Sequence, residues 1–587
     1  METLTLKHEK LKAIERIIFY IIIINTAFFL FYQLGRADSY TDGSHYSMRS
    51  VGLVDYLVPY QQTAPIQWYG KIPWWSKLSF HDAPPLVFII QNIFFKIFGD
   101  NTFAMRLPFA LAGMGTFFLV FMSAAKMFGK KIALISAGTL SISTLFSWVF
   151  RISYLEGIEI FFITFAFYLF IRALEKDSYF VWFWCALGCA LMSKYTSFFL
   201  MVFIFAYIAM WQRKIFFNKK FILGMIAFLV IISPVIFYNI MVYETRGHLD
   251  VQLSHLFPNM FEAAQRDWPG IYTDKTDSRN IYTNLKNIWP GMKEGFSFPF
   301  YIMMLFSVLH VAIKTLFFSK EHFEKFLLVA ILSASAMFMV ISPTSRYLPI
   351  FLPFLSLAIG VFISDMVKFF SKKSIGFIGI AAIIISIFGF EYMHSYRINH
   401  VPGFVASDKK IFSNIVERNL GYNQLEKFLK TTWENEDFYN KKLRKINVLD
   451  EIRLDWKSLQ GYNFYLFDFD LDWFARIWYF NRQWIYHKVP FMGDSEYIKE
   501  LVDSKISPQD SINVLRSLGI KNLFYIVGAN PLVYRGDYDS SNDRKDFVEN
   551  FENIFLEYIK NGSDGEVTPI YNDENKEAFR VLRIKLN

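Results

Sequence analysis

The chain has 587 residues, of which 53% are hydrophobic, with 67 Phe, 32 Tyr and a formal net charge of +9. This apolar fraction exceeds what a soluble protein of this length needs for its core, so the composition excludes an ordinary soluble enzyme and indicates a polytopic membrane protein. The positive charge does not indicate nucleic-acid binding, because the basic residues gather in short loops between apolar runs, as the positive-inside rule describes.

The apolar runs divide the chain into a membrane part and a soluble part. Runs of about 20 residues, the length that crosses a bilayer, recur from Glu15 to Tyr392, and the chain beyond is charged and mixed. The first run, residues 17–35, follows basic residues and has no small-residue cleavage site, so we expect a retained anchor with a cytoplasmic N-terminus. We predict a transmembrane domain at residues 1–398 and a soluble α/β domain at residues 399–587.

Charge decides how many of the apolar runs cross the membrane. Residues 84–99 form a short run that starts with two prolines and contains Lys96, which fits an interfacial or re-entrant helix rather than a span. Leaving this run out gives about eleven spans and outer loops at about 36–103 and 244–298, with the C-terminal domain also outside the cytoplasm. The basic residues then placed in the cytoplasm are Lys126, Lys130, Lys131, Arg172, Lys176, Arg213, Lys214, Lys219, Lys220, Lys314, Lys320, Lys325, Lys368, Lys372 and Lys373.

Two acids stand at the start of an otherwise apolar run. Glu156 and Glu159 would each cost roughly 2.5–3.5 kcal/mol inside hydrocarbon, so such groups often face a cavity. For Glu156, which follows Arg151 closely, we favour a functional role. For Glu159, snorkelling to the interface is an equal alternative.

The soluble domain reads as strands alternating with helices. Strands are expected in the apolar runs at 445–452, 463–473, 520–527 and 578–586, and a helix at 510–519. Three acids within the second run, Asp468, Asp470 and Asp472, alternate at period two and would share one strand face. A solvated strand face is the preferred interpretation, because the glycine that a calcium loop needs next is absent.

Five short motifs occur in an order that resembles a known family. They are "DGSHY" from Asp42, "APPL" leading to "FGDNTFAMRLPFAL", "RISYLEG" from Arg151, "ALMSKYTS" around Lys194, and "SRYLPIFLP" around Arg346. In this order the chain resembles the GT-C glycosyltransferases and is similar to the bacterial aminoarabinose transferases of lipid A and to the dolichyl-phosphate-mannose protein mannosyltransferases. The resemblance covers about residues 10–400 and implies a helical polytopic enzyme.

The resemblance implies an inverting transfer of a sugar from a polyprenyl-phosphate carrier, undecaprenyl phosphate in a bacterium, to an acceptor at the outer face of the membrane. The acceptor would be lipid A, another glycan or a protein. Asp42 aligns with the catalytic acid of the family, and a carboxylate there can take the proton of the acceptor hydroxyl. Glu156 falls where the family usually has Asp and would orient acceptor or sugar.

The leaving phosphate needs cations rather than a proton donor, because its own pKa is low. Lys194 and Arg346 are the first candidates, with Arg49 as a third. Tyr46 and Tyr347 align with recurring tyrosines that could bind phosphate or sugar, although interface tyrosines are an alternative. The predicted substrate-binding residues are Tyr46, Arg49, Asp82, Arg151, Lys194, Arg346 and Tyr347.

Phosphate binding near the first loop departs from the family, because Ala83 stands where aminoarabinose-type relatives commonly have Lys before the Pro-Pro pair. No cofactor is required by the predicted reaction. A divalent metal is the less favoured alternative, since carboxylate and imidazole are its usual ligands but the ligand spacing matches no metal motif. Its candidate ligands are His81, Asp82, His248 and His255.

Two other functions fit a polytopic chain. A transporter or flippase of lipid-linked substrates is the main alternative, but no internal repeat is visible and the polar residues cluster at the outer turns rather than at mid-span. An oligosaccharyltransferase would carry a Trp-Trp-Asp signature, whereas Trp75 is followed by Ser76. The expected partners are a sugar donor on polyprenyl phosphate, an acceptor and the lipid bilayer, and the expected location is a bacterial inner membrane with the active site on the periplasmic side.

Overall fold

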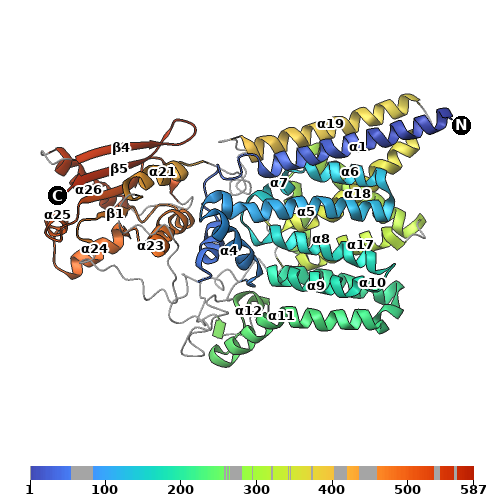
Figure 1. The fold of residues 1–587 in the computed structure, drawn as a ribbon, viewed down its shortest axis with the longest axis horizontal. Helices are drawn as coiled ribbons and strands as arrows, with labels where there is room; N and C mark the ends of the chain where they lie inside the picture. Colours follow the sequence, from blue (N-terminus) through green and yellow to red (C-terminus); the bar gives the residue numbers. More distant parts are fainter. Residues whose placement is uncertain are drawn as a thin grey trace. The chain divides into compact units, whose positions relative to one another are not determined.

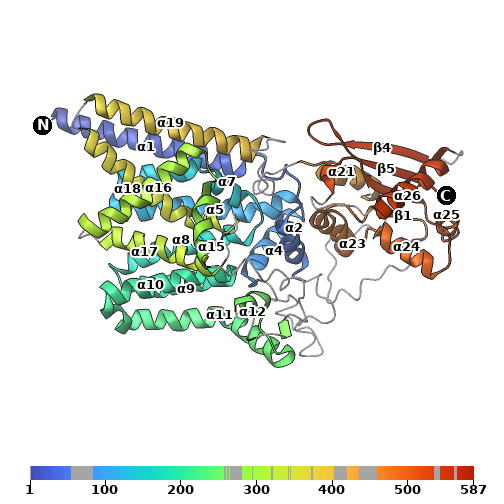
Figure 2. The same ribbon diagram turned by 180° about the vertical axis from the view of Figure 1, so that it is seen from behind.

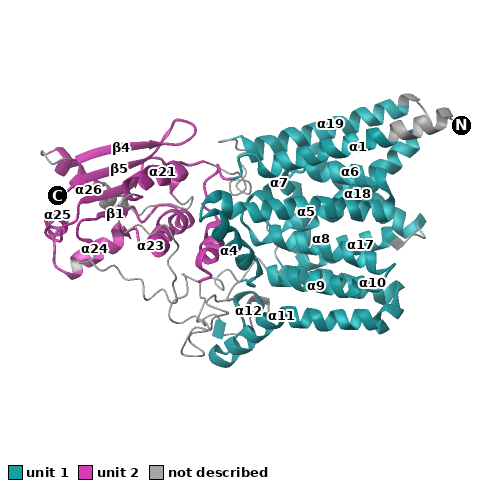
Figure 3. Cartoon of the chain, in the orientation of Figure 1, with its two compact units in different colours: residues 1–34, 57–416 teal, residues 35–56, 417–587 magenta. Residues whose placement is uncertain are grey.

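The chain forms two compact units in a computed structural model (Figure 3). Unit 1 comprises residues 1–34 and 57–416, and unit 2 comprises residues 35–56 and 417–587. The residues that the structure describes are 2–54, 83–256, 260, 263–264, 281–293, 295–318, 322–341, 343, 346–371, 374–401, 419–434, 459–534, 542–560 and 565–586.

The division differs from the predicted domains in two respects, the first being that the later boundary lies between residues 416 and 417 rather than between 398 and 399. Residues 35–56, which the sequence placed in the first outer loop of the transmembrane domain, belong to the unit that contains the C-terminal domain. Within this segment, α2 (Asp42–Gly52) packs against α22 (Trp473–Arg476) and the adjoining helical turn η7 (Ile477–Asn481). The segment that carries the predicted base is therefore folded onto the C-terminal domain.

The described residues of unit 1 form helices joined by turns and loops, with no strand among them, and the long helices lie side by side (Figures 1 and 2). The first helix, α1 (Glu2–Phe31), lies along α19 (Ser374–His400), where Phe28 stacks on Tyr396. The other helices are α4 (Leu86–Phe98), α5 (Thr102–Phe128), α6 (Lys130–Ile142), α7 (Thr144–Arg151), α8 (Leu155–Ala173), α9 (Tyr179–Ser193), α10 (Phe198–Trp211), α11 (Lys219–Arg246), α12 (Val251–Leu256), α15 (Ile281–Lys293), α16 (Phe298–Ile313), α17 (His322–Val340) and α18 (Leu352–Phe370).

Seven helices of the described residues are long and apolar enough to cross a membrane, and the bent pair α6 and α7 makes an eighth candidate. Helices α9 and α10 are apolar but shorter, and α8 carries two acids and an arginine in its 19 residues. If α8, α9 and α10 also cross the membrane, the eight candidate spans become the eleven expected from the sequence. The number of spans stays a prediction. Helix α4 has only 13 residues, as expected for the short run at 84–99.

The bend between α6 and α7 is 62° and is held by a buried acid from another helix. Glu391 of α19 is 0% exposed, and its Oε1 accepts hydrogen bonds from the N–H (2.9 Å) and the hydroxyl (2.8 Å) of Thr144. Its Oε2 accepts from the N–H of Ser297, before α16, at 2.8 Å. One carboxylate thus satisfies backbone donors that two helix starts leave without intrahelical partners.

Unit 2 is built around a five-stranded mixed sheet in the order β2-β1-β3-β5-β4. Strands β1, β2 and β3 are parallel, and β5 pairs antiparallel with both β3 and β4. The strands are β1 (Asn463–Phe467), β2 (Phe491–Gly493), β3 (Asn522–Gly528), β4 (Gly565–Tyr571) and β5 (Glu577–Lys585), and the helices are α21 (Tyr422–Trp433), α23 (Arg482–His487), α24 (Asp494–Asp503), α25 (Pro508–Ser517) and α26 (Asn542–Lys560).

Both faces of β1 are buried, which explains its unbroken apolar sequence. On one face, Phe464 and Leu466 pack in a core with side chains of α24, α25 and α26. On the other face, Tyr465 stacks edge-on against Trp433 of α21, and Phe467 stacks on Phe480. The strands expected from the second, third and fourth runs and the helix at 510–519 are confirmed, whereas the strand at 445–452 lies outside the described residues.

The prediction of a solvated face for the three alternating acids is wrong. Strand β1 ends at Phe467, and Asp468 is 1% exposed and accepts a hydrogen bond from the hydroxyl of Tyr534 at 2.8 Å. The other Asp468 oxygen accepts from the N–H of Asp470 at 2.9 Å, and Asp472 caps α22 by accepting from Ala475. The acids form the turn that follows a buried strand, because short side chains of this type bind nearby backbone N–H groups.

Candidate active site

A turn between two helices of unit 1 contacts three buried acids, Glu156, Glu159 and Asp250. Helix α9 ends at Ser193, Lys194 takes an extended backbone, and a short helical turn at Tyr195–Ser197 leads into α10. Three successive side chains each bind a different acid: Lys194 Nζ lies 2.5 Å from Glu156 Oε1, the Tyr195 hydroxyl donates to Asp250 at 2.7 Å, and the Thr196 hydroxyl donates to Glu159 at 2.5 Å.

The carboxylate of Glu156 lies between two cations. Besides Lys194, Arg346 approaches it, with Nε 3.8 Å from Oε1. The Arg346 guanidinium donates to the hydroxyl of Tyr347 at 2.7 Å, and Lys194 Nζ lies 3.7 Å from the centroid of the Tyr347 ring. Four predicted site residues from three separate motifs therefore meet in one cluster.

Exposure separates the two cations of this cluster. The side chains of Glu156 and Lys194 are 6% and 4% exposed, whereas that of Arg346 is 31% exposed. A buried lysine beside a carboxylate is a paired charge whose position is fixed. Arg346 is the more exposed of the two cations, and a planar guanidinium is a group that can bind two phosphate oxygens at once.

Glu159 faces the interior of unit 1. It is 1% exposed and is held by the hydroxyl of Thr196, so the snorkelling interpretation does not describe it. Because Thr196 follows Lys194 by two residues, Glu159 helps to fix the same turn that pairs Lys194 with Glu156.

Asp250 is a member of this polar network that the sequence did not reveal. It is 0% exposed and accepts from Tyr195, from the Asn239 side chain (2.9 Å) and from the N–H of Leu253 (2.9 Å). Its own N–H donates to Asn239 Oδ1 at 2.8 Å. Within the surrounding sequence "RGHLD", only His248 is one of the candidate ligands predicted from the sequence. An isolated acid in a long polar loop gives no sequence signal of burial.

Arg151 has a structural role in the fold. Its guanidinium Nη1 donates to the carbonyl oxygens of Phe29 (3.1 Å) and Tyr32 (2.9 Å), where α1 ends, and the side chain is 2% exposed. A cation there binds carbonyls that lack intrahelical donors and complements the negative end of the helix dipole. The predicted substrate contact of Arg151 stays a prediction.

The other part of the predicted site lies on α2 in unit 2. Asp42 is the first residue of this helix, and Tyr46 and Arg49 follow at i+4 and i+7, so the three share one helix face. Asp42 and Tyr46 are partly exposed and Arg49 is buried. Next to this face, the ring of His45 stacks on that of Trp473. The predicted residues are thus divided between two compact units.

The metal candidates are not brought together as far as the structure describes them. His81 and Asp82 lie outside the described residues, as does the side chain of His255. His248 is fully buried, with Nδ1 2.6 Å from the carbonyl oxygen of Leu249. Within the described residues, no three His, Cys, Asp or Glu side chains group as metal ligands. Metal dependence stays a prediction.

Sequence comparisons match the part of the chain that contains Glu156 and Lys194, two of the four residues of this cluster. The model of the dolichyl-phosphate-mannose-protein mannosyltransferase family matches residues 82–238, which include Glu156 and Lys194. Two mannosyltransferase-like proteins of Bacillus subtilis are also similar: YkcB is 32% identical over 95 residues and YycA 35% over 80 residues, or 16% and 14% of this chain. The matches span only 13% and 12% of the lengths of those proteins.

Structural comparisons extend over nearly the whole chain. ArnT from Cupriavidus metallidurans in its apo state aligns with a TM-score of 0.51 at 12% identity, over 97% of this chain and 98% of ArnT. The undecaprenyl phosphate-bound form of ArnT gives a TM-score of 0.50 over 96% and 98%. The apo oligosaccharyltransferase of Archaeoglobus fulgidus also gives 0.50, at 11% identity, over 87% of this chain and 69% of that protein. At these identities the likeness establishes the fold.

Proposed function

We propose that the chain is a membrane glycosyltransferase of the GT-C type, which moves a sugar from a polyprenyl-phosphate carrier to an acceptor hydroxyl at the outer face of the membrane; the family-model match and the ArnT-like fold support this proposal. The observation that carries this proposal is the cluster of Glu156, Lys194, Arg346 and Tyr347, in which a buried carboxylate fixes one cation while a second remains reachable. Such a site suits a phosphate leaving group.

The reaction is an inverting displacement. The acceptor oxygen forms a bond to the anomeric carbon as the bond between that carbon and the phosphate oxygen breaks, and the electron pair of the broken bond stays on the phosphate. Arg346 would bind the charge that develops there, and the Lys194–Glu156 pair would hold Tyr347 and Arg346 in place. No proton donor is needed at the leaving group.

The proton of the acceptor hydroxyl goes to Asp42. This carboxylate is partly exposed at the first turn of α2, which is a usable position for a general base. Tyr46, which is partly exposed, lies on the same helix face and would contact the substrate beside it, whereas the substrate contact of Arg49, which is 0% exposed, stays a prediction. The sugar is a hexose or pentose, and the acceptor is lipid A, another glycan or a protein.

The test is a donor assay with the purified full chain in lipid nanodiscs. Polyprenyl-phosphate mannose, glucose and aminoarabinose are supplied in turn, and released polyprenyl phosphate is measured by mass spectrometry. We expect release from at least one donor by the wild type and loss of it in Asp42→Asn, with Asp510→Asn, an exposed acid of unit 2, as the matched control. Lack of turnover of all donors by the wild type contradicts the function, and full activity of Asp42→Asn contradicts the base.

A further inference from the structure

Helix α21 of unit 2 is capped by a residue from near the start of the chain, 383 residues before Gly421. The helix starts after Gly421, which has no side chain to bind the first N–H groups. Asp38, from the segment after α1, takes this place: its Oδ2 accepts from the N–H groups of Leu420 (2.6 Å) and Gly421 (2.9 Å). The N–H of Tyr422 donates to the same oxygen at 3.1 Å, and that of Asn423 donates to Oδ1 at 2.8 Å.

This contact has the chemistry of an anion site at a helix N-terminus. Four backbone N–H groups converge on one carboxylate, where the helix dipole also favours negative charge. Asp38 is 2% exposed, although an acid just after the first apolar run would be expected at the surface. Burial raises the pKa of Asp38 to about 6, and the hydrogen bonds from the four N–H groups oppose that rise.

Backbone geometry at Gly421 makes the close approach feasible. Its φ is +110°, a conformation that side chains disfavour, and a Cβ there would lie 2.5 Å from the Cβ of Ala578. Glycine is therefore required where Asp38 meets the helix. A substituted residue would have to move either the loop or strand β5.

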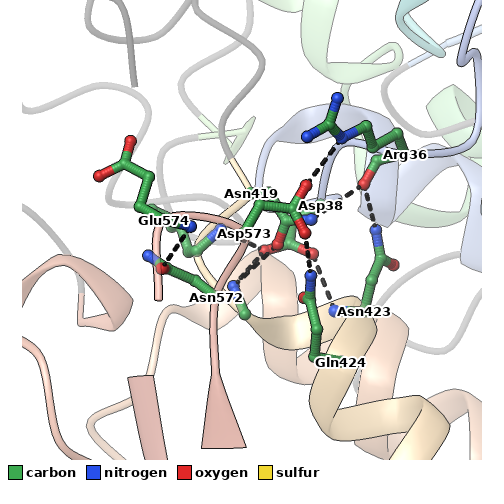
Figure 4. A network of polar contacts seen from close by, with 10 residues as sticks. Arg36, Asp38, Asn419, Asn423, Gln424, Asn572, Asp573 and Glu574 are labelled. Atoms are coloured by element: carbon green, nitrogen blue, oxygen red, sulfur yellow. Dashed lines mark hydrogen bonds and ion pairs between the residues drawn. The ribbon is translucent and has the colours of Figure 1, made fainter. Parts of the chain in front are cut away.

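Arg36, two residues before Asp38, also binds the segment after α1 to the C-terminal domain. Arg36 pairs with Asp573 at 2.7 Å, and its carbonyl oxygen accepts from the side-chain amide of Asn423 at 2.8 Å (Figure 4). Gln424 in turn donates to Asp573 at 2.6 Å (Figure 4). The Arg36 and Asp573 side chains are partly exposed, so this pair contributes little by itself.

A buried tyrosine continues the connection toward α2. The hydroxyl of Tyr479 accepts from the N–H of Ser39 at 3.0 Å and donates to Asn423 Oδ1 at 2.8 Å. Further along, the hydroxyl of Tyr486 donates to the carbonyl oxygen of Met48, within α2, at 3.2 Å. The contacts thus run from Arg36 to Met48 and bracket Asp42.

We propose that Asp38 is a positioning residue, which fixes residues 35–52 to the C-terminal domain and thereby places Asp42, four residues later. The C-terminal domain then contributes to catalysis by positioning α2, the helix that carries the proposed base and that packs on this domain. This inference rests on the proposed function for its catalytic consequence. The attachment of residues 35–52 to the C-terminal domain through Asp38, called the Asp38 anchor below, is measured independently of activity.

The first readout is hydrogen–deuterium exchange of the full chain in lipid nanodiscs at neutral pH. Asp38→Asn keeps one acceptor oxygen but turns an amide N–H₂ toward backbone donors. We expect the amides of residues 420–423 and of α2 to exchange at least about tenfold faster, with exchange in α5 and α8 unchanged. The matched control is Asp510→Asn, which alters an exposed acid in the first turn of α25 and leaves α2 protected.

A second variant covers the case in which Asp38→Asn does not accumulate. Tyr479→Phe keeps the ring and removes the hydroxyl that joins Ser39 to Asn423. We expect faster exchange of the amides of residues 420–423 and α2, by a smaller factor than in Asp38→Asn. Exchange of these amides in Tyr479→Phe then tests the Asp38 anchor in place of Asp38→Asn. Wild-type exchange in both regions for every variant that folds overturns the anchor.

The second readout separates positioning from substrate binding. With a donor that the wild type turns over, Asp38→Asn lowers kcat by about tenfold to a hundredfold and leaves the KM for the donor within about twofold, because the base is displaced while the phosphate site is intact. Unchanged kcat together with faster exchange overturns the positioning role. If the wild type turns over no donor, the proposed function fails while exchange still decides on the anchor.

Discussion

The ammonium of Lys194 lies 2.5 Å from Glu156 Oε1, and neither side chain is more than 6% exposed. The two residues come from separate turns of the chain, one at the start of α8 and the other at the end of α9, helices that pack along each other (Figure 1). A buried pair of this kind fixes geometry more than it stabilises the fold, because desolvation offsets much of the attraction.

The first prediction concerns this pair. Removing one partner leaves the other as an uncompensated buried charge, so Glu156→Gln and Lys194→Met should each lower the free energy of unfolding by about 3–5 kcal/mol. The double variant should lose less than the sum of the two, because it buries no unpaired charge. Unfolding of the full chain in mixed detergent micelles measures all three, and strict additivity would show that the pair is not coupled.

The second prediction concerns the more exposed cation. Arg346→Gln should raise the KM for the lipid-phosphate donor by about tenfold or more, because a charge-assisted contact to phosphate is lost, whereas Arg346→Lys should retain part of the binding. Arg213→Gln, a change of an exposed arginine in another turn, is the matched control. Donor titrations with each variant measure the effect. A normal KM in Arg346→Gln would remove Arg346 from the phosphate site.

The third prediction is a pH dependence of unit 2. Burial, followed by the nearby Asp494 carboxylate, raises the pKa of Asp468 to about 7, from 3.8 for the unburied group. The folded state therefore holds this proton more tightly than the unfolded state, so the stability that Asp468 contributes is fully present below about pH 4 and is lost as pH rises to about 7. Asp468→Asn, which is always neutral, should flatten this change.

Amide exchange of β1 and β3 in the full chain, corrected for intrinsic rates, measures that dependence across the same pH range. The wild type should lose protection relative to Asp468→Asn as pH rises. The hydroxyl of Tyr534 donates to Asp468, and that of Tyr525 donates to Asp494, the second carboxylate whose charge disfavours ionisation of Asp468. An unchanged difference between the two proteins from pH 4 to pH 7 would contradict the raised pKa.

The sequence predicts elements whose signal is local and misses those set by distant partners. The apolar runs indicate β1, β3 and β5, and the motif order brings Glu156, Lys194 and Arg346 into one hypothesis. The end of β1 at Phe467 is not visible, because the period-two pattern continues into the turn and only the partner strands decide where pairing stops. Nor is the Asp38 anchor visible, because backbone N–H groups, its binding partners, are the same in almost every sequence.

The fourth prediction fixes the sidedness on which the proposed reaction depends. The basic loops predict that the C-terminal domain lies outside the cytoplasm and the end of α18 inside. With Cys185 and Cys189 replaced by Ala, Lys576→Cys should react with a membrane-impermeant maleimide added to intact cells, and Ser371→Cys should react only after permeabilisation. Both positions are exposed in the fold, so protein burial does not explain a lack of reaction.

Ser44, although nearer to Asp42, is 0% exposed and would stay unlabelled on either side of the membrane. Labelling of Ser371→Cys but not Lys576→Cys in intact cells would reverse the topology and place Asp42 and its anchor in the cytoplasm, where an outer-face transfer is excluded.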